Sequence, residues 1–412
     1  MDTLKVRDAK DVEAAVRAAI ASDQPLEIVG HGTKRMVGQT MATNALLDLS
    51  ALNAVISYEP SELIITVEAG APLADVKSLI DSKNQRFAFE PMETARLLGT
   101  PAAGTIGGMI AAGLAGPRRI QAGAARDHLL GAHAVSGFGD SFKAGGTVVK
   151  NVTGYDLCKL LAGSWGTLAV MTEVTLKVMP KPESECTLVL RNLDDSTANQ
   201  AMTAALGSPF DVSGAAHVPK SALRDAAGSL GGLGSPRQAL TLLRLEGIAA
   251  SVAHRSVSLA RLLQRFGTTK TIDNERSAAA WECIRDVEPF AAKGPLGAWP
   301  VWRIVCPPAA GAALGERLVR ETGGDVLYDW GGGLIWAAIP PKPDAQAALV
   351  RQRAAAVGGH AMLLRASGEV RRQVDVFQPA AEGVAALNER VRQSFDPKGI
   401  LNRGRMSRGT MV

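Results

Sequence analysis

Apolar and polar residues alternate in the first part of the chain with spacings that predict helices and strands in turn. Residues 9–21 carry apolar positions at helical spacing, and residues 26–33 (LEIVGHGT) read as a short strand that runs into a glycine turn. Strand-like runs follow at residues 54–58 and 63–68. The pattern therefore predicts a helix–strand–loop unit followed by a pair of strands.

Two later segments mark the end of a first domain. Residues 99–116 are dense in glycine, which suits tight loops and close-packed helix starts, and we expect a helix to begin at Met109. Residues 168–178 alternate as a strand does and lead into PKPE. We place the boundary at this proline-rich stretch, so that the first domain covers residues 1–180.

The second half alternates strand candidates with helical segments. The strand candidates lie at residues 187–191, 240–245, 301–305, 333–339 and 362–364. This order predicts an antiparallel sheet with helices packed on one face, an α+β cap domain over residues 181–380.

A last helix is expected at residues 382–395, where Asp396 and Pro397 stop it. The rest of the chain then returns as an irregular tail. We therefore treat residues 381–412 as a third segment that packs on the first domain.

Composition places the chain among globular proteins of two domains. Of its 412 residues 46% are apolar and 21% charged, and the net charge of +5 is thinly spread. The densest basic run is Arg403, Arg405 and Arg408 in the tail, which we expect to be solvated. The charge pattern predicts no nucleic-acid partner.

The cysteines and the N-terminus narrow the class further. Four cysteines lie far apart and form no C-x-x-C pair, so neither an iron–sulfur cluster nor structural zinc is predicted. Residues 1–20 read as an amphipathic helix, without the apolar core of a signal peptide, and no apolar run is long enough to span a bilayer. We expect a cytoplasmic protein that does not insert into a membrane and whose membrane association, if any, is made through partners.

A pair of glycine-rich turns, at residues 29–35 (VGHGTKR) and 99–113 (GTPAAGTIGGMIAAG), carries the chemistry. Where side chains are absent, successive main-chain N–H groups can approach and stabilise a diphosphate. Neither turn has the G-x-G-x-x-G or G-x-x-x-x-G-K-[ST] order, which disfavours a nicotinamide fold and a P-loop. The remaining common ligand with a diphosphate is FAD.

Three blocks, at residues 99–131, 150–178 and 394–406, look like the vanillyl-alcohol oxidase family of flavoproteins. The resemblance implies an α+β chain: a PCMH-type FAD-binding domain of two subdomains, then an α+β cap domain with an antiparallel sheet, and a C-terminal tail that returns to the flavin domain. It also implies that both glycine loops clasp the FAD diphosphate.

Carried over position by position, the resemblance implies a set of FAD-binding residues in the two glycine loops, the later blocks and the tail. They are Val29, Gly30, His31, Gly32, Thr33, Pro101, Gly104, Thr105, Gly107, Gly108, Asn151, Gly166, Thr167, Glu173 and Asn402. Relatives that attach FAD covalently have a histidine where this chain has Thr33. We therefore expect non-covalent FAD.

The runs GPRR, ARDHLLG and KNVTGYDL are most similar to the branch of glycolate oxidases and D-lactate dehydrogenases, which act on small 2-hydroxy acids. Residues 328–336 (YDWGGGLIW) look like the FAD-binding subunit of glycolate oxidases. That subunit works beside a second flavoprotein subunit and an iron–sulfur subunit. Two alternatives stay open: a self-sufficient dehydrogenase of the D-lactate type, and an assembly subunit without flavin.

A 2-hydroxy acid needs a cation for its carboxylate and a base for its hydroxyl proton. Arg118, Arg119 and Arg126 are the candidate carboxylate clamps, although they could equally pair with Asp127 or with solvent. Lys150 and the neighbouring Asn151 belong to a turn that relatives place near the flavin, although loop hydrogen bonding would explain them as well.

Catalytic relatives share an H-G-D-G-N-like block whose histidine, with a second one nearby, holds a metal or assists proton removal, and this chain has no such block. No metal site is therefore predicted, and the catalytic base stays unassigned.

Overall fold

The computed structural model describes residues 2–43, 45–100, 104–147, 154–223, 230–233 and 238–408. Its first part contains two sheets, whose buried side chains pack together in one cluster. A parallel sheet has the order β1 (Asp2–Lys5), β3 (Ala45–Asp48), β2 (Leu26–Val29). An antiparallel sheet has the order β4 (Val55–Glu59), β5 (Ile64–Glu68), β9 (Ala169–Lys177), β7 (Leu129–Ser136), β8 (Ser141–Gly145). A small pair joins β6 (Gln85–Arg86) to β10 (Met179–Pro180).

Strand β9 is the centre of this first part because both of its faces are buried. Val170 packs into the cluster that holds α1 (Ala9–Ser22), whereas its neighbour Met171 packs on the other side. The remaining helices of this part are α2 (Leu73–Asp81), α3 (Ala95–Leu98), α4 (Ile106–Ala112), α5 (Arg119–Ala122), α6 (Ala125–His128) and α7 (Leu157–Leu161).

The second part is one large antiparallel sheet. Its order is β14 (Lys270–Ile272), β11 (Ser184–Arg191), β13 (Leu240–Gly247), β12 (Val212–Val218), β16 (Asp325–Asp329), β17 (Leu334–Ala338), β15 (Val301–Val305), β18 (His360–Arg365). Short 3-10 turns are η1 (Gly231–Leu233), η2 (Gln264–Phe266), η3 (Glu288–Phe290), η4 (Pro308–Ala310) and η5 (Trp330–Gly332).

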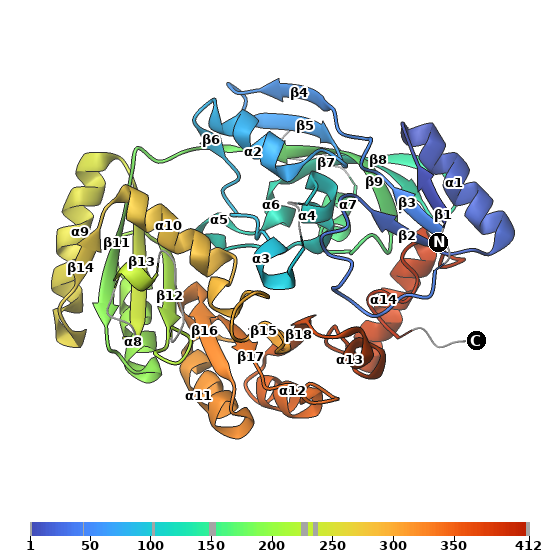
Figure 1. Cartoon of the computed structure of the whole chain (residues 1–412). Helices are drawn as coiled ribbons and strands as arrows, with labels where there is room; N and C mark the ends of the chain where they lie inside the picture. The colour runs from blue at the N-terminus through green and yellow to red at the C-terminus, as the bar shows by residue number, and fades with distance from the viewer. Residues whose placement is uncertain are drawn as a thin grey trace.

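Helices cover this sheet almost as the sequence predicts. One face packs against α8 (Asp195–Leu206), α9 (Ala249–Leu263), α11 (Gly311–Thr322) and α12 (Ala347–Ala355). The exception is α10 (Asn274–Arg285), whose Trp281 packs on the opposite face in a cluster shared with the first part of the chain (Figure 1). The predicted fold class is thus confirmed, and the cap's second face is the contact between the two parts.

The C-terminal tail runs back to the first part. After α13 (Gly368–Gln373), helix α14 (Glu382–Phe395) has the predicted bounds and packs on the first part, where Phe395 lies against Phe142 of β8. Asp396 turns the chain, because its carboxylate accepts the main-chain N–H groups of Ile400 and Leu401, both at 2.8 Å. Leu401 then bridges to Leu26 of β2.

The expectation of a solvated basic tail is wrong for Arg405 but holds for Arg403 and Arg408, which are exposed. Arg405 is only 5% exposed. Arg403 pairs with Asp23 at 3.2 Å and Arg408 with Asp375 at 3.4 Å.

Two local expectations also need correction. The N-terminus is not one helix, since residues 2–5 form β1 and the helix starts only after Asp8, whose side chain accepts the N–H of Asp11. The helix expected from Met109 begins three residues earlier, at Ile106, because Thr105 caps it. Within the described ranges no helix is long and apolar enough to cross a membrane.

Candidate functional site

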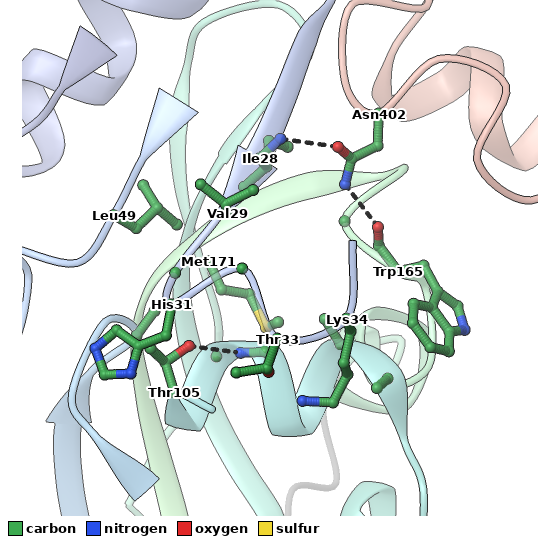
Figure 2. A pocket seen from close by; sticks show the side chains of 18 of the residues that line it. Ile28, Val29, His31, Thr33, Lys34, Leu49, Thr105, Trp165, Met171 and Asn402 are labelled. Carbon is green, nitrogen blue, oxygen red and sulfur yellow. Dashed lines mark hydrogen bonds between the residues drawn. The ribbon is translucent and has the colours of Figure 1, made fainter. Parts of the chain in front are cut away.

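A cleft opens where the loop after β2, the start of α4, the turn before β9 and the C-terminal tail meet (Figure 2). Its volume is about 720 Å³ with its open mouth included. Many of the residues implicated by sequence line it: Val29, Gly30, His31, Gly32, Thr33, Thr105, Gly107, Gly108, Gly166 and Asn402. The fold thus brings together segments from both ends of the chain.

Unpartnered main-chain N–H groups are the main feature of the first loop. Within the described part of the chain, the N–H groups of Gly30, Gly32, Thr33 and Lys34 have no hydrogen-bond acceptor, and all four residues line the cleft. Gly32 has φ of +66°, a conformation that glycine adopts without strain. Orphan N–H groups gathered in a turn form a concavity suited to an anion.

The second loop contributes differently from the sequence expectation. The N–H groups of Ile106 and Gly107 bond to Ala71 O and Ala69 O, and Gly108 N donates to the Thr105 hydroxyl at 3.2 Å. Because these N–H groups already have acceptors, they do not add free donors to the cleft. Helix α4 is also short, with only seven residues.

Gly107 in particular has a packing role. A Cβ there would lie 2.7 Å from the Cβ of Ala69. A Gly107→Val substitution would therefore disturb the packing of α4 on the sheet and would not probe the ligand directly.

The two glycine loops touch each other. A Cβ on Gly30 would lie 2.4 Å from Thr105 Oγ1, and one on Gly104 would lie 3.0 Å from Lys34 Nζ. The absence of side chains at these two positions is what lets the loops close around the cleft.

Asn402 fastens the tail to the cleft with both ends of its amide. Its Oδ1 accepts Ile28 N at 2.8 Å and its Nδ2 donates to Trp165 O at 2.7 Å (Figure 2). A Cβ on Gly166 would come within 2.7 Å of that Nδ2. Because its polar atoms are engaged, Asn402 positions the wall of the cleft.

Besides Arg35, which pairs with Glu27, two cations line the cleft that the sequence analysis did not assign to the site, Lys34 and Arg405. Burial, together with the charge of Arg405, lowers the pKa of Lys34 to about 8. Burial lowers the pKa of Arg405 to about 10, and its guanidinium donates to Lys34 O and lies 5.5 Å from the centre of the Trp165 ring. Lys34 belongs to the VGHGTKR run, so its position in the first glycine loop could have indicated a role at the cleft.

Several implicated residues lie elsewhere. Glu173 faces a second cavity with Glu68 and His133. The Thr167 hydroxyl donates to Ser164 O at 2.7 Å. Pro101, Lys150 and Asn151 fall outside the described residues.

The candidate carboxylate clamps are placed as follows. Arg118 is 4% exposed and holds the Glu246 carboxylate through Nε at 2.9 Å and a terminal nitrogen at 2.7 Å. Its main-chain N–H donates to Glu90. This engagement, with acids other than the expected Asp127, leaves Arg118 poorly placed to hold a substrate. Arg126 is exposed.

The cleft fits FAD. The unpartnered N–H groups and the two cations suit a diphosphate, and the apolar side chains of Ile28, Leu49 and Met171 suit the uncharged parts. No group of three or more His, Cys, Asp or Glu side chains among the described residues could hold a metal ion.

Comparisons with known proteins agree with this fit. A family model described as FAD binding domain matches residues 3–145. Glycolate oxidase subunit GlcE of Escherichia coli (strain K12) is 30% identical over 393 residues, which is 95% of each chain. D-lactate dehydrogenase of Anaerostipes hadrus is 29% identical over 192 residues, covering 46% of this chain and 39% of the relative.

Solved structures show the same fold. A p-cresol methylhydroxylase with substrate bound superposes with a TM-score of 0.70 at 14% identity, over 98% of this chain and 88% of the other.

Proposed function

The chain belongs to the family of FAD-binding oxidoreductases that includes glycolate oxidase subunit GlcE, and from that premise we propose that it is the FAD-carrying subunit of a multi-subunit glycolate oxidase. Its cofactor is FAD, which the family model and the relatives support independently of the cleft. The proposed reaction is oxidation of glycolate to glyoxylate.

The observation that carries the proposal is the set of unpartnered N–H groups at Gly30, Gly32, Thr33 and Lys34, beside two cations. These amides would hold the diphosphate. Bound FAD supplies a two-electron acceptor for the hydrogen on the carbinol carbon of a 2-hydroxy acid. The chain itself would bind and orient the FAD, and Trp165 and Met171 give the cleft an apolar lining.

We propose the division into residues 1–180, 181–380 and 381–412 as working domains. The sheets support it, because β10 (Met179–Pro180) ends the first part and β11 (Ser184–Arg191) starts the cap sheet. The tail then joins the first part through Leu401 and Asn402.

The proposed partners are a second flavoprotein subunit and an iron–sulfur subunit. In the described part of this chain the four cysteines, Cys158, Cys186, Cys283 and Cys306, are buried and form no disulfide, and they contribute to no group that could hold a metal. A cluster that passes electrons onward would therefore be contributed by a partner.

The test is to purify the chain with ample riboflavin in the medium, count flavin per chain, and add glycolate without oxygen. We expect one non-covalent FAD per chain, with bleaching in the assembled complex. Bleaching of the isolated chain by glycolate or D-lactate would instead establish a self-sufficient dehydrogenase. A colourless chain with no affinity for added FAD would refute the proposal.

Lys34 predicts how FAD affinity depends on pH. An anion beside the ammonium favours its charged form, so the pKa of Lys34 rises from about 8 when FAD binds. Affinity should be constant below that pH and fall above it, by at most about tenfold per pH unit. Titration of flavin fluorescence at several pH values measures this.

Lys34→Arg is the matched control, because a guanidinium stays charged throughout this range. Its affinity should be flat where the wild type declines. A wild-type affinity that does not change above pH 8 would remove Lys34 from the diphosphate site.

A further inference from the structure

Arg303 differs from Arg244 and Arg405, which also lie against tryptophan rings. Arg244 lies 4.6 Å from the centre of the Trp281 ring and is paired with a carboxylate, and Arg405 donates to a carbonyl. Arg303 is half-buried, and none of the described residues accepts a hydrogen bond from its guanidinium or forms an ion pair with it. Even partial burial of a charge without an acid or acceptor to pair with costs free energy, so the position of Arg303 needs an explanation.

A second unpaired guanidinium approaches the same indole. Arg303 of β15 lies 5.2 Å from the centre of the Trp330 ring, and Arg119 of α5 lies 5.0 Å from it. No acceptor or acid among the described residues engages the Arg119 side chain either. Two like charges on one ring repel each other unless an anion joins them.

One acid lies on the same face of the sheet but does not form an ion pair with Arg303 in the described structure. This acid is Asp329, whose carboxylate accepts Trp330 N at 2.7 Å. Burial raises the pKa of Asp329 to about 7, so a sizeable fraction of its carboxyl is protonated at neutral pH. Burial, together with the charge of Arg119, lowers the pKa of Arg303 to about 10, which an added anion would reverse.

The pair of Arg303 and Arg119 lies where the two parts of the chain meet. Arg119 belongs to α5, the helix that follows the cleft-lining α4 in sequence. Trp330 donates its indole N–H to Gly116 O at 3.0 Å. Gly116 lies between Ala112, which lines the cleft, and Arg119. Arg303 projects from the cap face that packs on the first part. Val301 lies two residues before it in β15, therefore on the same face, and belongs to the cluster shared by the two parts.

We propose that Arg303 and Arg119 form a carboxylate site that takes a small 2-hydroxy acid between the cap sheet and α5. Planar guanidinium groups bind carboxylates through paired hydrogen bonds. This inference rests on the proposed function, because it names where the substrate of that function binds. It replaces Arg118, which is engaged with Glu246 and Glu90.

The test is calorimetric titration of the FAD-loaded chain with glycolate, alongside acetate and inorganic phosphate. Arg303→Gln should weaken glycolate binding by about tenfold to a hundredfold, because it removes charge-assisted hydrogen bonds. Flavin content and Tm should stay near wild type. Arg265→Gln is the matched control, since Arg265 also stacks on a ring, that of Phe266, outside this interface, and glycolate binding should be unchanged.

The titrations have outcomes that would overturn the proposed carboxylate site. Wild-type glycolate affinity in an Arg303→Gln protein that retains flavin would overturn the site. So would the finding that none of the three anions binds to the wild-type chain. Equal binding of glycolate, acetate and phosphate, all weakened by Arg303→Gln, would support an anion site and overturn its assignment to a 2-hydroxy acid.

The flavin content of the same samples tests FAD binding independently. One flavin per chain together with unchanged glycolate binding in Arg303→Gln would overturn the carboxylate site but not the FAD-binding part of the proposed function. If Arg303→Gln does not fold, the exposed Arg119→Gln carries the test and should also weaken glycolate binding at least severalfold.

Discussion

Alanine at position 30 is expected to weaken FAD binding by about fivefold to a hundredfold. Its Cβ would lie 2.4 Å from Oγ1 and 2.6 Å from Cγ2 of Thr105, closer than any real contact. Overpacking of this kind costs about 1–3 kcal/mol, and 2.7 kcal/mol corresponds to about a hundredfold in affinity. The loops must separate, which moves the amides of Gly32 and Thr33 out of register with the diphosphate.

The measurement is flavin content after purification and the Kd from quenching of flavin fluorescence. A second substitution, Thr105→Ala, removes the two atoms that clash and should restore part of the affinity. Gly383→Ala is the control, because a Cβ there meets nothing within 4 Å. A Gly30→Ala chain with one FAD and wild-type Kd would show that the loops do not close on the cofactor.

Replacing Arg244 by methionine is expected to lower the free energy of unfolding by about 3–5 kcal/mol, because it leaves buried carboxylates without their counter-charge. Arg244 is 1% exposed. It holds the Glu90 carboxylate at 2.7 and 2.9 Å and lies 3.4 Å from Glu246. Arg118 closes the network from the first part of the chain. The substitution thus breaks the charged contact between the two parts.

Acid should weaken the same contact in the wild type. Burial alone would raise the pKa of Glu90, but the charges of Arg244 and Arg118 outweigh it and bring that pKa down to about 2. A carboxyl with a lowered pKa contributes stability that is full above its unfolded value, near 4.5, and is lost as the pH falls toward 2. In Arg244→Met the pKa of Glu90 rises, so acid unfolding should begin at a higher pH.

Thermal and urea unfolding between neutral and acid pH measure both effects. Arg317→Gln is the control, because its pair with Glu321 lies on the surface and its loss should not change Tm measurably. Adding Glu90→Gln to Arg244→Met should recover part of the loss by removing the stranded charge. An Arg244→Met chain as stable as the wild type would show that the network does not hold the two parts together.

The sequence by itself determined the local elements and the segments that carry the cofactor chemistry. Helix α14 has the predicted bounds, and the strand at residues 301–305 is found as predicted. Both follow from periodicity and from stop residues, which act over a few neighbours. The first glycine loop was readable for the same reason, since a turn depends on its own residues.

Strands such as β7, β12 and β16 were not anticipated. Their burial patterns are nearly continuous, so apolar periodicity does not separate them from other buried segments.

Only the tertiary structure decided the roles of individual side chains. Gly107 faces Ala69, Arg118 pairs with Glu246 across 128 residues, and Arg405 is buried beneath Trp165 although its run looks like a solvated tail. A pattern of apolar positions shows that a face is buried but not what covers it. Charge pairing and close packing depend on partners distant in the chain, and these become neighbours only when the cap and the tail fold onto the first part.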